Sequence, residues 1–442
     1  MRHVSSDVGF RAGAAKVDIT PPVGCWLEGI PRDQPSNAIH DPLYARALVI
    51  EQGRERICLV TCDLIGMTNE YARDVRTRIA EAIDSRFDSV VVACSHTHSG
   101  PMMLALFDPV ERIDQQYLRD LSERLVHVSR QAAEQLQPAQ LGVGRGEETT
   151  ISQYRRLWTR DGRIVMNWEE FPADQIVGPA EEGDPELGVV RINTLSGDTI
   201  AVIFNYACHP NSLPGDNFTI TADFPGYAAD MIERTLGGIA LFTNGAQGSV
   251  DIEGFVDRDF VGVERRGRAL GNAVLQVCAG IQEMERQPII RSARHTFLMP
   301  YRKVAPELIA WAEEVVARGP RETVTLRDGI SDEIKAEFIL KHANRREPGA
   351  EFELVGLRMG KAVFVTIPGE PFTEIGRRMK ALAPDLQLHV IALANGYLGY
   401  IATAKASAEG GYATDVASGS PFVENAEDLI CENTIMLLTR LR

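Results

Sequence analysis

Three apolar runs of this chain end in the same way, and this repeated pattern constrains the fold more than any other feature of the sequence. The runs at residues 90–94, 200–207 and 240–243 are each followed by polar residues and a turn that contains Gly or Pro. Such short runs, rich in β-branched residues, are typical of buried strands, and α/β proteins place their chemistry where such strands end. The pattern therefore predicts a sheet with a functional site along one edge.

Histidines mark two of these three strand ends. The first run leads into Ser-His-Thr-His-Ser-Gly-Pro, and the second ends on His209, which is followed at once by Pro. In a strand, residues two apart share a face, so His96 and His98 are expected to face the same space where the strand ends. A His-x-His pair by itself is equally typical of hydrogen-bonded core or turn residues, so the pair needs support from elsewhere in the chain.

The remaining patterns favour an α/β fold of the mixed α+β kind, with mixed β-sheets flanked by helices. Amphipathic stretches follow several of the strand-like runs, and Thr68 stands where the N-cap of one such helix belongs. Near residue 285 a long helical stretch gives way to a strand-like run, a charged helical stretch and a polar connector, which favours a boundary there. We expect a single domain over residues 1–442 with two lobes, 1–285 and 286–442, of which the first carries the histidines described above.

Charge and hydropathy exclude several classes of function. The chain has 442 residues and carries 46 Lys and Arg against 61 Asp and Glu, a net charge of -15, which disfavours a broad surface for nucleic acid or anionic membranes. The N-terminal stretch lacks the apolar core of a signal peptide, and no apolar run approaches 18 residues. These features predict a cytoplasmic protein without stable membrane insertion.

Histidines at strand ends together with a carboxylate are the ligands that a zinc site requires. Zinc takes imidazole nitrogen and carboxylate oxygen in a tetrahedral arrangement, and a catalytic site keeps one position for water. Spacing alone makes ligands of three histidines, His96, His98 and His209. It leaves the carboxylate open among Asp63, Asp223 and Glu370, because Asp223 also stands where a helix N-cap belongs and Asp63 could orient a ligand or cap a turn.

Seven fragments of the chain resemble, in order, the neutral/alkaline ceramidases, a family of zinc-dependent amidases. They cover nearly all of residues 10–415. The fragments are AGAAKVDITPPVG, HDPLYARALVIE, SHTHSGP, CHPNSL followed by TADFPGYAADMIE, FTNGAQGSVDI, IPGEPFTEIGRR and NGYLGYIATAKASAEGGY.

This resemblance implies a division of labour among the candidate site residues. It implies four Zn²⁺ ligands, His96, His209, Glu370 and Tyr400. It also implies three residues at the reaction centre, His98, Arg155 and Tyr412. Zinc would activate a water and polarise the scissile carbonyl, His98 would transfer a proton, and the other two would stabilise the oxyanion. Tyr397 competes with Tyr400 for its role, and Arg156 competes with Arg155.

The chain departs from the family pattern in its Gly-rich turn and in its length. Ceramidases have Gly-Asp-Val-Ser-Pro where this chain has Gly248-Ser249-Val250-Asp251-Ile252, so Asp251 takes the place of a serine. The C-terminal β-rich domain of secreted ceramidases is also not found here. We therefore expect a smaller, soluble N-acyl amide as the substrate instead of ceramide.

Apolar residues in the loops expected around the site indicate a partly hydrophobic substrate. They are Met102, Met103, Leu104, Phe107, Trp168 and Phe171. Three other functions remain open: a zinc-dependent esterase or lactonase, an amidase of ceramide or another N-acyl lipid, and a catalytically silent ligand-binding homologue. The expected partner is a small acyl amide or ester, with no nucleic acid, and the sequence leaves a homo-oligomer open.

Overall fold

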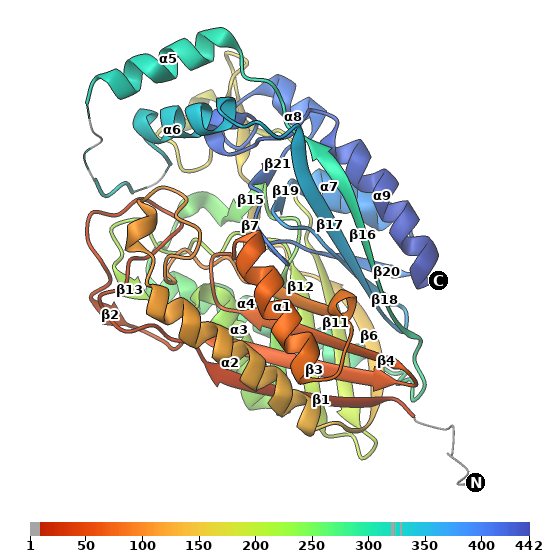
Figure 1. Ribbon diagram of the computed structural model, residues 1–442. Coiled ribbons are helices and arrows are strands. Elements are labelled where there is room, and N and C mark those ends of the chain that lie inside the picture. Colours follow the sequence, from red (N-terminus) through yellow and green to blue (C-terminus); the bar gives the residue numbers. More distant parts are fainter. Residues whose placement is uncertain (1–8, 320–321, 323, 328) are drawn as a thin grey trace.

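The structure is a computed structural model that describes residues 9–319, 322, 324–327 and 329–442. The start of the N-terminal stretch discussed above, residues 1–8, lies outside the described residues. Two β-sheets dominate the described chain, and helices cover their outer sides (Figure 1).

The larger sheet has eight strands in the order β14-β12-β11-β6-β1-β3-β4-β5. The β4–β5 and β12–β14 pairs are parallel and the other pairs are antiparallel, so the sheet is mixed. Its strands are β1 (Arg11–Asp18), β3 (Tyr44–Gln52), β4 (Glu55–Cys62), β5 (Val90–Cys94), β6 (Gln137–Glu147), β11 (Glu186–Thr194), β12 (Thr199–Tyr206) and β14 (Ile239–Asn244).

The smaller sheet has four strands in the order β16-β17-β18-β20. They are β16 (Ile290–Pro300), β17 (Gly349–Met359), β18 (Ala362–Thr366) and β20 (Gln387–Ile391). Short strands form additional small sheets: β2 (Ala38–Ile39) with β13 (Thr219–Ile220), β7 (Ser152–Tyr154) with β15 (Val250–Ile252), β19 (Glu370–Pro371) with β21 (Tyr400–Ile401), and β8 (Arg156–Thr159) between β9 (Ile164–Met166) and β10 (Ile176–Pro179).

The helices are α1 (Asn69–Ala82), α2 (Gln115–Glu134), α3 (Asp223–Leu236), α4 (Phe260–Gly280), α5 (Pro306–Ala317), α6 (Asp332–Ala343), α7 (Thr373–Ala381), α8 (Ala404–Glu409) and α9 (Ala426–Leu441). Helices α1 to α4 pack on the larger sheet and α7 and α9 on the smaller one, while α5 and α6 pack on each other beyond the sheets. Helix α1 begins as expected, because the Thr68 side chain accepts a hydrogen bond from the Tyr71 amide at 3.2 Å.

The two sheets and their helices form four layers. Along β5, Val90 and Val92 pack toward α1 and α2, while Val91 and Ala93 pack against the smaller sheet. This alternation follows from the period of two in a strand and explains why the run is apolar throughout. On the far side of the smaller sheet, α7 and α9 complete the fourth layer (Figure 1).

This architecture confirms the predicted mixed α/β fold. The described strands of the larger sheet all precede residue 285 and those of the smaller sheet all follow it, but one apolar core joins the two sheets. No described helix combines the length and the apolar character needed to cross a membrane. The parallel pairs β4–β5 and β12–β14 end close to the strands β19 and β21, and this edge carries the candidate site.

Candidate active site

The two histidines of the first strand end do not reach the site as the sequence predicted. Strand β5 ends at Cys94, and His96 has φ 77°, which is the left-handed region and not an extended one. The prediction that strand alternation places both rings on one face is therefore wrong, because the chain has already turned. Backbone hydrogen bonds fix that turn, from the His96 amide to Leu64 and from the His98 amide to Pro210. The two rings still lie close, with centroids 4.9 Å apart.

Backbone carbonyls determine which ring nitrogen of each buried histidine is free. Nδ1 of His96 lies 2.7 Å from the Ile65 carbonyl oxygen, and Nδ1 of His209 lies 2.9 Å from that of Val250. A carbonyl only accepts, so Nδ1 carries the proton in each neutral ring and Nε2 presents a lone pair. In this state both rings could bind a metal ion through the Nε2 lone pair.

Glu370 places one carboxylate oxygen between these two lone pairs. Its Oε2 lies 3.3 Å from Nε2 of His96 and 3.0 Å from Nε2 of His209, and it is buried without a hydrogen-bond partner. The other oxygen, Oε1, accepts a hydrogen bond from the Tyr397 hydroxyl at 2.7 Å. Tetrahedral ligands at zinc distances stand about 3.3 Å apart, so these three atoms fit a shared cation.

The charges of these three residues depend on one another. Burial lowers the pKa of His96, but Glu370 outweighs burial and raises that pKa above its usual value. Burial raises the pKa of Glu370, but His96 and His209 outweigh burial and hold that pKa well below its usual range. Glu370 is therefore a carboxylate. Burial lowers the pKa of His209, and Arg155 lowers it further, so this ring is neutral and able to act as a ligand.

Tyr400 and His98 lie next to this cluster. The Tyr400 hydroxyl lies 3.4 Å from Nε2 of His209, and Tyr400 pairs with Glu370 across the β19–β21 register. Both ring nitrogens of His98 are buried without a hydrogen-bond partner, and burial followed by the charge of His96 lowers the pKa of His98 well below its usual value. The rings of His96, His98 and His209 also form a compact group that could hold an ion with nitrogen ligands alone.

Arg155 lies among the aromatic rings of the site. One guanidinium nitrogen donates to the Gly248 carbonyl at 2.7 Å, and the group lies 5.1 Å from the centre of the Tyr400 ring and 5.4 Å from that of Tyr412. Burial would lower the pKa of Arg155, but Tyr400 and the carboxylate of Asp251 raise it above its usual value. Burial raises the pKa of Tyr412 to about 12. The centre therefore holds a fixed cation beside a neutral phenol.

The neighbouring Arg156 is directed elsewhere. Its guanidinium pairs with Glu409 at 3.0 Å and donates to the Gly410 carbonyl. Of the two candidate arginines, only Arg155 lines the cavity.

A cavity of about 570 Å³ opens over these residues. Among the apolar loop residues singled out in the sequence, Leu104, Phe107 and Trp168 line it. Met102, Met103 and Phe171 do not, and Met103 packs in the core of the larger sheet instead. The cavity is thus partly hydrophobic, as the sequence suggested, although only half of the expected residues contribute.

The altered Gly-rich turn places Asp251 in the cavity wall and Ser249 outside it. Ser249 donates to Glu374 at 3.1 Å and accepts from the Thr373 amide, so it joins the turn to α7. Asp251 is buried, and its Oδ2 lies 3.9 Å from Arg155. The chain thus offers a carboxylate, and no hydroxyl, at this position of the reaction centre.

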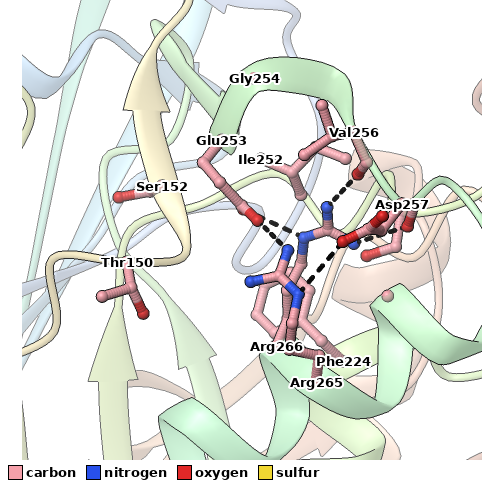
Figure 2. A network of polar contacts seen from close by, with 12 residues as sticks. Thr150, Ser152, Phe224, Ile252, Glu253, Gly254, Val256, Asp257, Arg265 and Arg266 are labelled. Atoms are coloured by element: carbon pink, nitrogen blue, oxygen red, sulfur yellow. Dashed lines mark hydrogen bonds and ion pairs between the residues drawn. The ribbon is translucent and has the colours of Figure 1, made fainter.

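Two arginines of α4 hold the segment that follows Asp251. Figure 2 shows Arg265 and Arg266 reaching Glu253, which lies directly after β15. Arg266 also donates to the carbonyls of Val256 at 2.6 Å and Asp257 at 3.2 Å (Figure 2). Since Arg266 is fully buried, these bonds hold the segment after β15 against α4.

The other two candidate carboxylates lie outside the cluster. Asp63 pairs with buried Arg46 at 2.9 Å and accepts from the Tyr44 amide, and within the described structure it has no hydrogen bond to the three clustered histidines. Asp223 is the first residue of α3 and not its N-cap, and it accepts from the amides of Ser212 and Phe224. The cap expected at Asp223 is wrong, because the side chain joins α3 to the segment after His209.

Three residues support the site in ways that the sequence analysis did not predict. The Tyr397 hydroxyl holds Glu370, as described above. Buried Arg32 donates to the carbonyl of His98 at 2.9 Å, and Gly29, with φ 107°, lies so close that an added Cβ would be 2.5 Å from Cγ of His98. A signal existed only for Tyr397, which stands in the same fragment as Tyr400.

A family model described as "Neutral/alkaline non-lysosomal ceramidase, N-terminal" matches residues 10–250. The neutral ceramidase of Pseudomonas aeruginosa is 25% identical over 260 residues, which is 56% of this chain and 37% of that protein. The neutral ceramidase of Mycobacterium tuberculosis is 26% identical over 291 residues, 58% of this chain and 43% of that protein. The chain thus spans less than half of the length of these relatives.

Solved structures show the same fold. The crystal structure of neutral ceramidase from Pseudomonas aeruginosa superposes with a TM-score of 0.72 at 19% identity, covering 98% of this chain and 75% of that chain. A structure described as "Ceramidase complexed with C2" gives a TM-score of 0.74 at the same identity, covering 98% and 76%.

Proposed function

The chain belongs to the neutral/alkaline non-lysosomal ceramidase family, and from this premise we propose that it is a zinc-dependent hydrolase that cleaves the amide bond of a soluble N-acyl substrate. The observation that carries the proposal is the position of Glu370 Oε2, a buried oxygen without a hydrogen-bond partner between two histidine lone pairs. A buried carboxylate of this kind is costly unless positive charge lies beside it, and a metal ion bound between the carboxylate and the two histidines would supply that charge.

The proposed metal ligands are His96, His209, Glu370 and Tyr400. Two imidazoles and a carboxylate match the ligand preference of zinc, and Tyr400 lies 3.4 Å from the free nitrogen of His209. A zinc ion bound there would supply a water of lowered pKa and polarise the carbonyl of the substrate.

The residues of the chain supply the remaining chemistry. His98 is neutral and its ring nitrogens are unshared, so it can take a proton from the attacking water and return it to the leaving amine. Arg155 and Tyr412 lie beside the ligands and can stabilise the negative charge on the carbonyl oxygen. Arg155 is already held by the Gly248 carbonyl, so it needs little reorganisation.

The substrate is proposed to be smaller than ceramide. The cavity of about 570 Å³ has the size of sites for small molecules, and Leu104, Phe107 and Trp168 offer it an apolar wall. Asp251 replaces the family serine beside Arg155, so the contacts at the reaction centre differ from those of the ceramidases.

The test measures metal content by mass spectrometry and hydrolysis of a panel of N-acyl amides and esters. We expect about one zinc per chain in the wild type and the loss of both metal and activity in the His96→Ala/His209→Ala double variant. A His127→Ala/His295→Ala variant is the matched control, because those histidines lie outside the cavity lining.

Each outcome of this test decides between the candidate functions. Faster turnover of esters than of amides would identify an esterase or lactonase. Preference for ceramide would identify a lipid amidase, and metal binding without any turnover would identify a silent binding protein. A wild type that binds no zinc after supplementation would contradict the mechanism.

A further inference from the structure

The wall of the cavity away from the metal ligands has a polar character that the proposed chemistry does not use. Helix α6 and the residues after it bring Lys341, His342 and Arg345 into the cavity lining, and Tyr301 lines it beside them. This group is called the outer wall below.

The two cations of the outer wall have no acidic partner within the described chain. Neither the Lys341 nor the Arg345 side chain forms an ion pair or a hydrogen bond with any residue that the structure describes, although many other arginine side chains do. The Arg345 guanidinium lies over the Tyr301 ring at 4.3 Å, and that ring stacks on Phe422 at 5.6 Å. A cation–π contact of this kind positions the guanidinium while leaving its N–H groups available to a ligand.

His342 adds an acceptor to the same place. It is 7% exposed, its Nε2 donates to the Arg302 carbonyl at 2.8 Å, and its ring meets that of Tyr301 at 5.4 Å. Because the carbonyl fixes the proton on Nε2, Nδ1 is a lone-pair acceptor, and this atom is buried without a hydrogen-bond partner in the described structure. A buried acceptor without a donor is costly unless a ligand or a water supplies one.

The contacts along the cavity give the separation between the outer wall and the reaction centre. An added Cβ on Gly419 would lie 3.9 Å from the Tyr400 ring and 3.8 Å from the Phe338 ring, so Gly419 lies close to both rings. Lys341 and His342 follow Phe338 by one turn of α6. With a helical rise of about 5.4 Å per turn, the outer wall lies on the order of 10 Å from Tyr400.

Phe338 and its surroundings make the intervening stretch apolar. The Phe338 ring meets that of Phe107 at 6.1 Å, and both line the cavity. Besides Asp251 and Glu370 at the inner end, the cavity lining contains one more acidic residue, Glu70 in the first turn of α1, so the lining outside the inner end carries two positive charges and one negative charge. A ligand that spans the cavity therefore meets fixed charges and ligating atoms at one end, an apolar stretch, and excess positive charge with an acceptor at the other.

We propose that the substrate carries a carboxylate beside an N–H donor at the end of an apolar spacer, bound by Lys341, Arg345 and His342. This inference rests on the proposed function, because it assigns the class of amide that the same site cleaves: an acidic N-acyl compound with its negative end held away from the scissile bond. The carboxylate meets the two cations, and the neighbouring N–H donates to Nδ1 of His342.

The test compares three chromogenic anilides of equal spacer length that differ only in their far end: methyl, carboxylate, or carboxymethylamide, which has both an N–H and a carboxylate. We expect kcat/KM to rise at least tenfold from methyl to carboxylate and further to carboxymethylamide. In the Lys341→Ala/Arg345→Ala variant the gain from the carboxylate should fall by roughly tenfold, since each exposed pair contributes modestly. Lys335→Ala, on the same helix but outside the cavity lining, should keep the full preference.

His342 is tested by its own substitution. His342→Phe removes the acceptor and keeps an aromatic ring beside Tyr301, so it should abolish the advantage of carboxymethylamide over carboxylate. The advantage of carboxylate over methyl should persist in this variant. Equal kcat/KM for all three ends in the wild type would overturn the inference.

A binding measurement separates failure of this inference from failure of the proposed function. Calorimetry with octanedioic acid and octanoic acid requires no turnover. If the wild type hydrolyses none of the anilides but binds the diacid more tightly, and loses this preference in Lys341→Ala/Arg345→Ala, the outer wall is an acid-binding site and the hydrolase proposal fails. If the anilides are hydrolysed without any effect of their far end, the hydrolase proposal stands and the acidic substrate is excluded.

Discussion

The two ends of the cavity differ in how their polar atoms are held. At the inner end, His96 and His209 are tied to backbone carbonyls through Nδ1, and Tyr397 holds Glu370. At the outer end, Lys341 and Arg345 are exposed and have no acidic partner among the described residues. The difference teaches that the inner end is organised for chemistry before any substrate arrives. The cations of the outer end are available to contact a substrate. Substitutions there should therefore alter substrate preference more than kcat.

Removing the negative charge of Glu370 should break the inner end most severely. Glu370→Gln replaces the oxygen between the two histidines by a neutral amide, so we expect at least a ~10³-fold loss of kcat/KM, as metal and oxyanion stabilisation fail together. Metal content should fall with it. Glu374→Gln, a buried carboxyl bonded to Tyr154 and Ser249, is the control and should keep its metal. Metal retention in Glu370→Gln would contradict the proposed ligand set.

Arg155→Gln should separate charge stabilisation from metal binding at the inner end. We expect kcat to fall by about 10²- to 10³-fold with unchanged metal content, because one fixed oxyanion partner is lost. Arg156→Gln is the matched variant, a buried arginine of the same strand region that pairs with Glu409. It should lower the melting temperature and leave kcat within a few fold. Equal losses of kcat in the two variants would remove Arg155 from the reaction centre.

Gly29→Ala should show how tightly the ring of His98 is packed. The new Cβ would lie 2.5 Å from Cγ of His98, and φ 107° adds backbone strain, so we expect a loss of about 1–3 kcal/mol in the free energy of unfolding and roughly tenfold lower kcat. Gly24 has φ 101° but nothing within 4 Å of an added Cβ. Gly24→Ala therefore carries similar strain without the contact, and its kcat should stay unchanged. Similar kcat in the two variants would show that strain alone acts.

The prediction with the smallest effect on activity concerns the stability of the protein at acid pH. His389 is fully buried far from the cavity lining, and burial, followed by the charge of Lys380, lowers its pKa to about 3. Between that value and the pKa of about 6.5 in an unfolded chain, the unfolded state binds one proton more. Stability should therefore fall as the pH drops through this window, by up to ~1.4 kcal/mol per pH unit.

Urea unfolding between pH 4 and pH 7 measures this contribution. His389→Gln should flatten the acid side of the stability profile by up to one proton, even if the variant is less stable at every pH. An unchanged slope would show that His389 is protonated in the folded protein.

Much of the fold was readable from the sequence because its signals are local. The apolar run at 90–94 faces both a helix layer and a second sheet, so its continuous hydrophobicity predicted a strand buried on both sides. The Thr68 cap has a local cause as well, since the side chain bonds an amide three residues away. The match of the family model confirmed the membership that the fragments indicated, while the ligand set implied by the fragments stays a prediction that the experiments above test.

The failures also have identifiable causes. His96 departs from strand geometry at φ 77°, which no alternation pattern reveals. Asp223 bonds to Ser212, which lies eleven residues earlier, so its role depends on how α3 packs. Arg32 and Gly29 support His98 from a segment about seventy residues away, and no sequence pattern around them predicts this role.

The sequence by itself determined which residue types the chain offers for chemistry, which runs form strands, and to which family the chain belongs. These follow from local periodicity and from the order of short fragments along one dimension. Only the tertiary structure decided that Glu370 faces Nε2 of two histidines, that Arg155 and not Arg156 enters the cavity, and that Lys341 and Arg345 have no acidic partner among the described residues. Such facts depend on directions and distances between segments far apart in the chain, and the packing of four layers sets them.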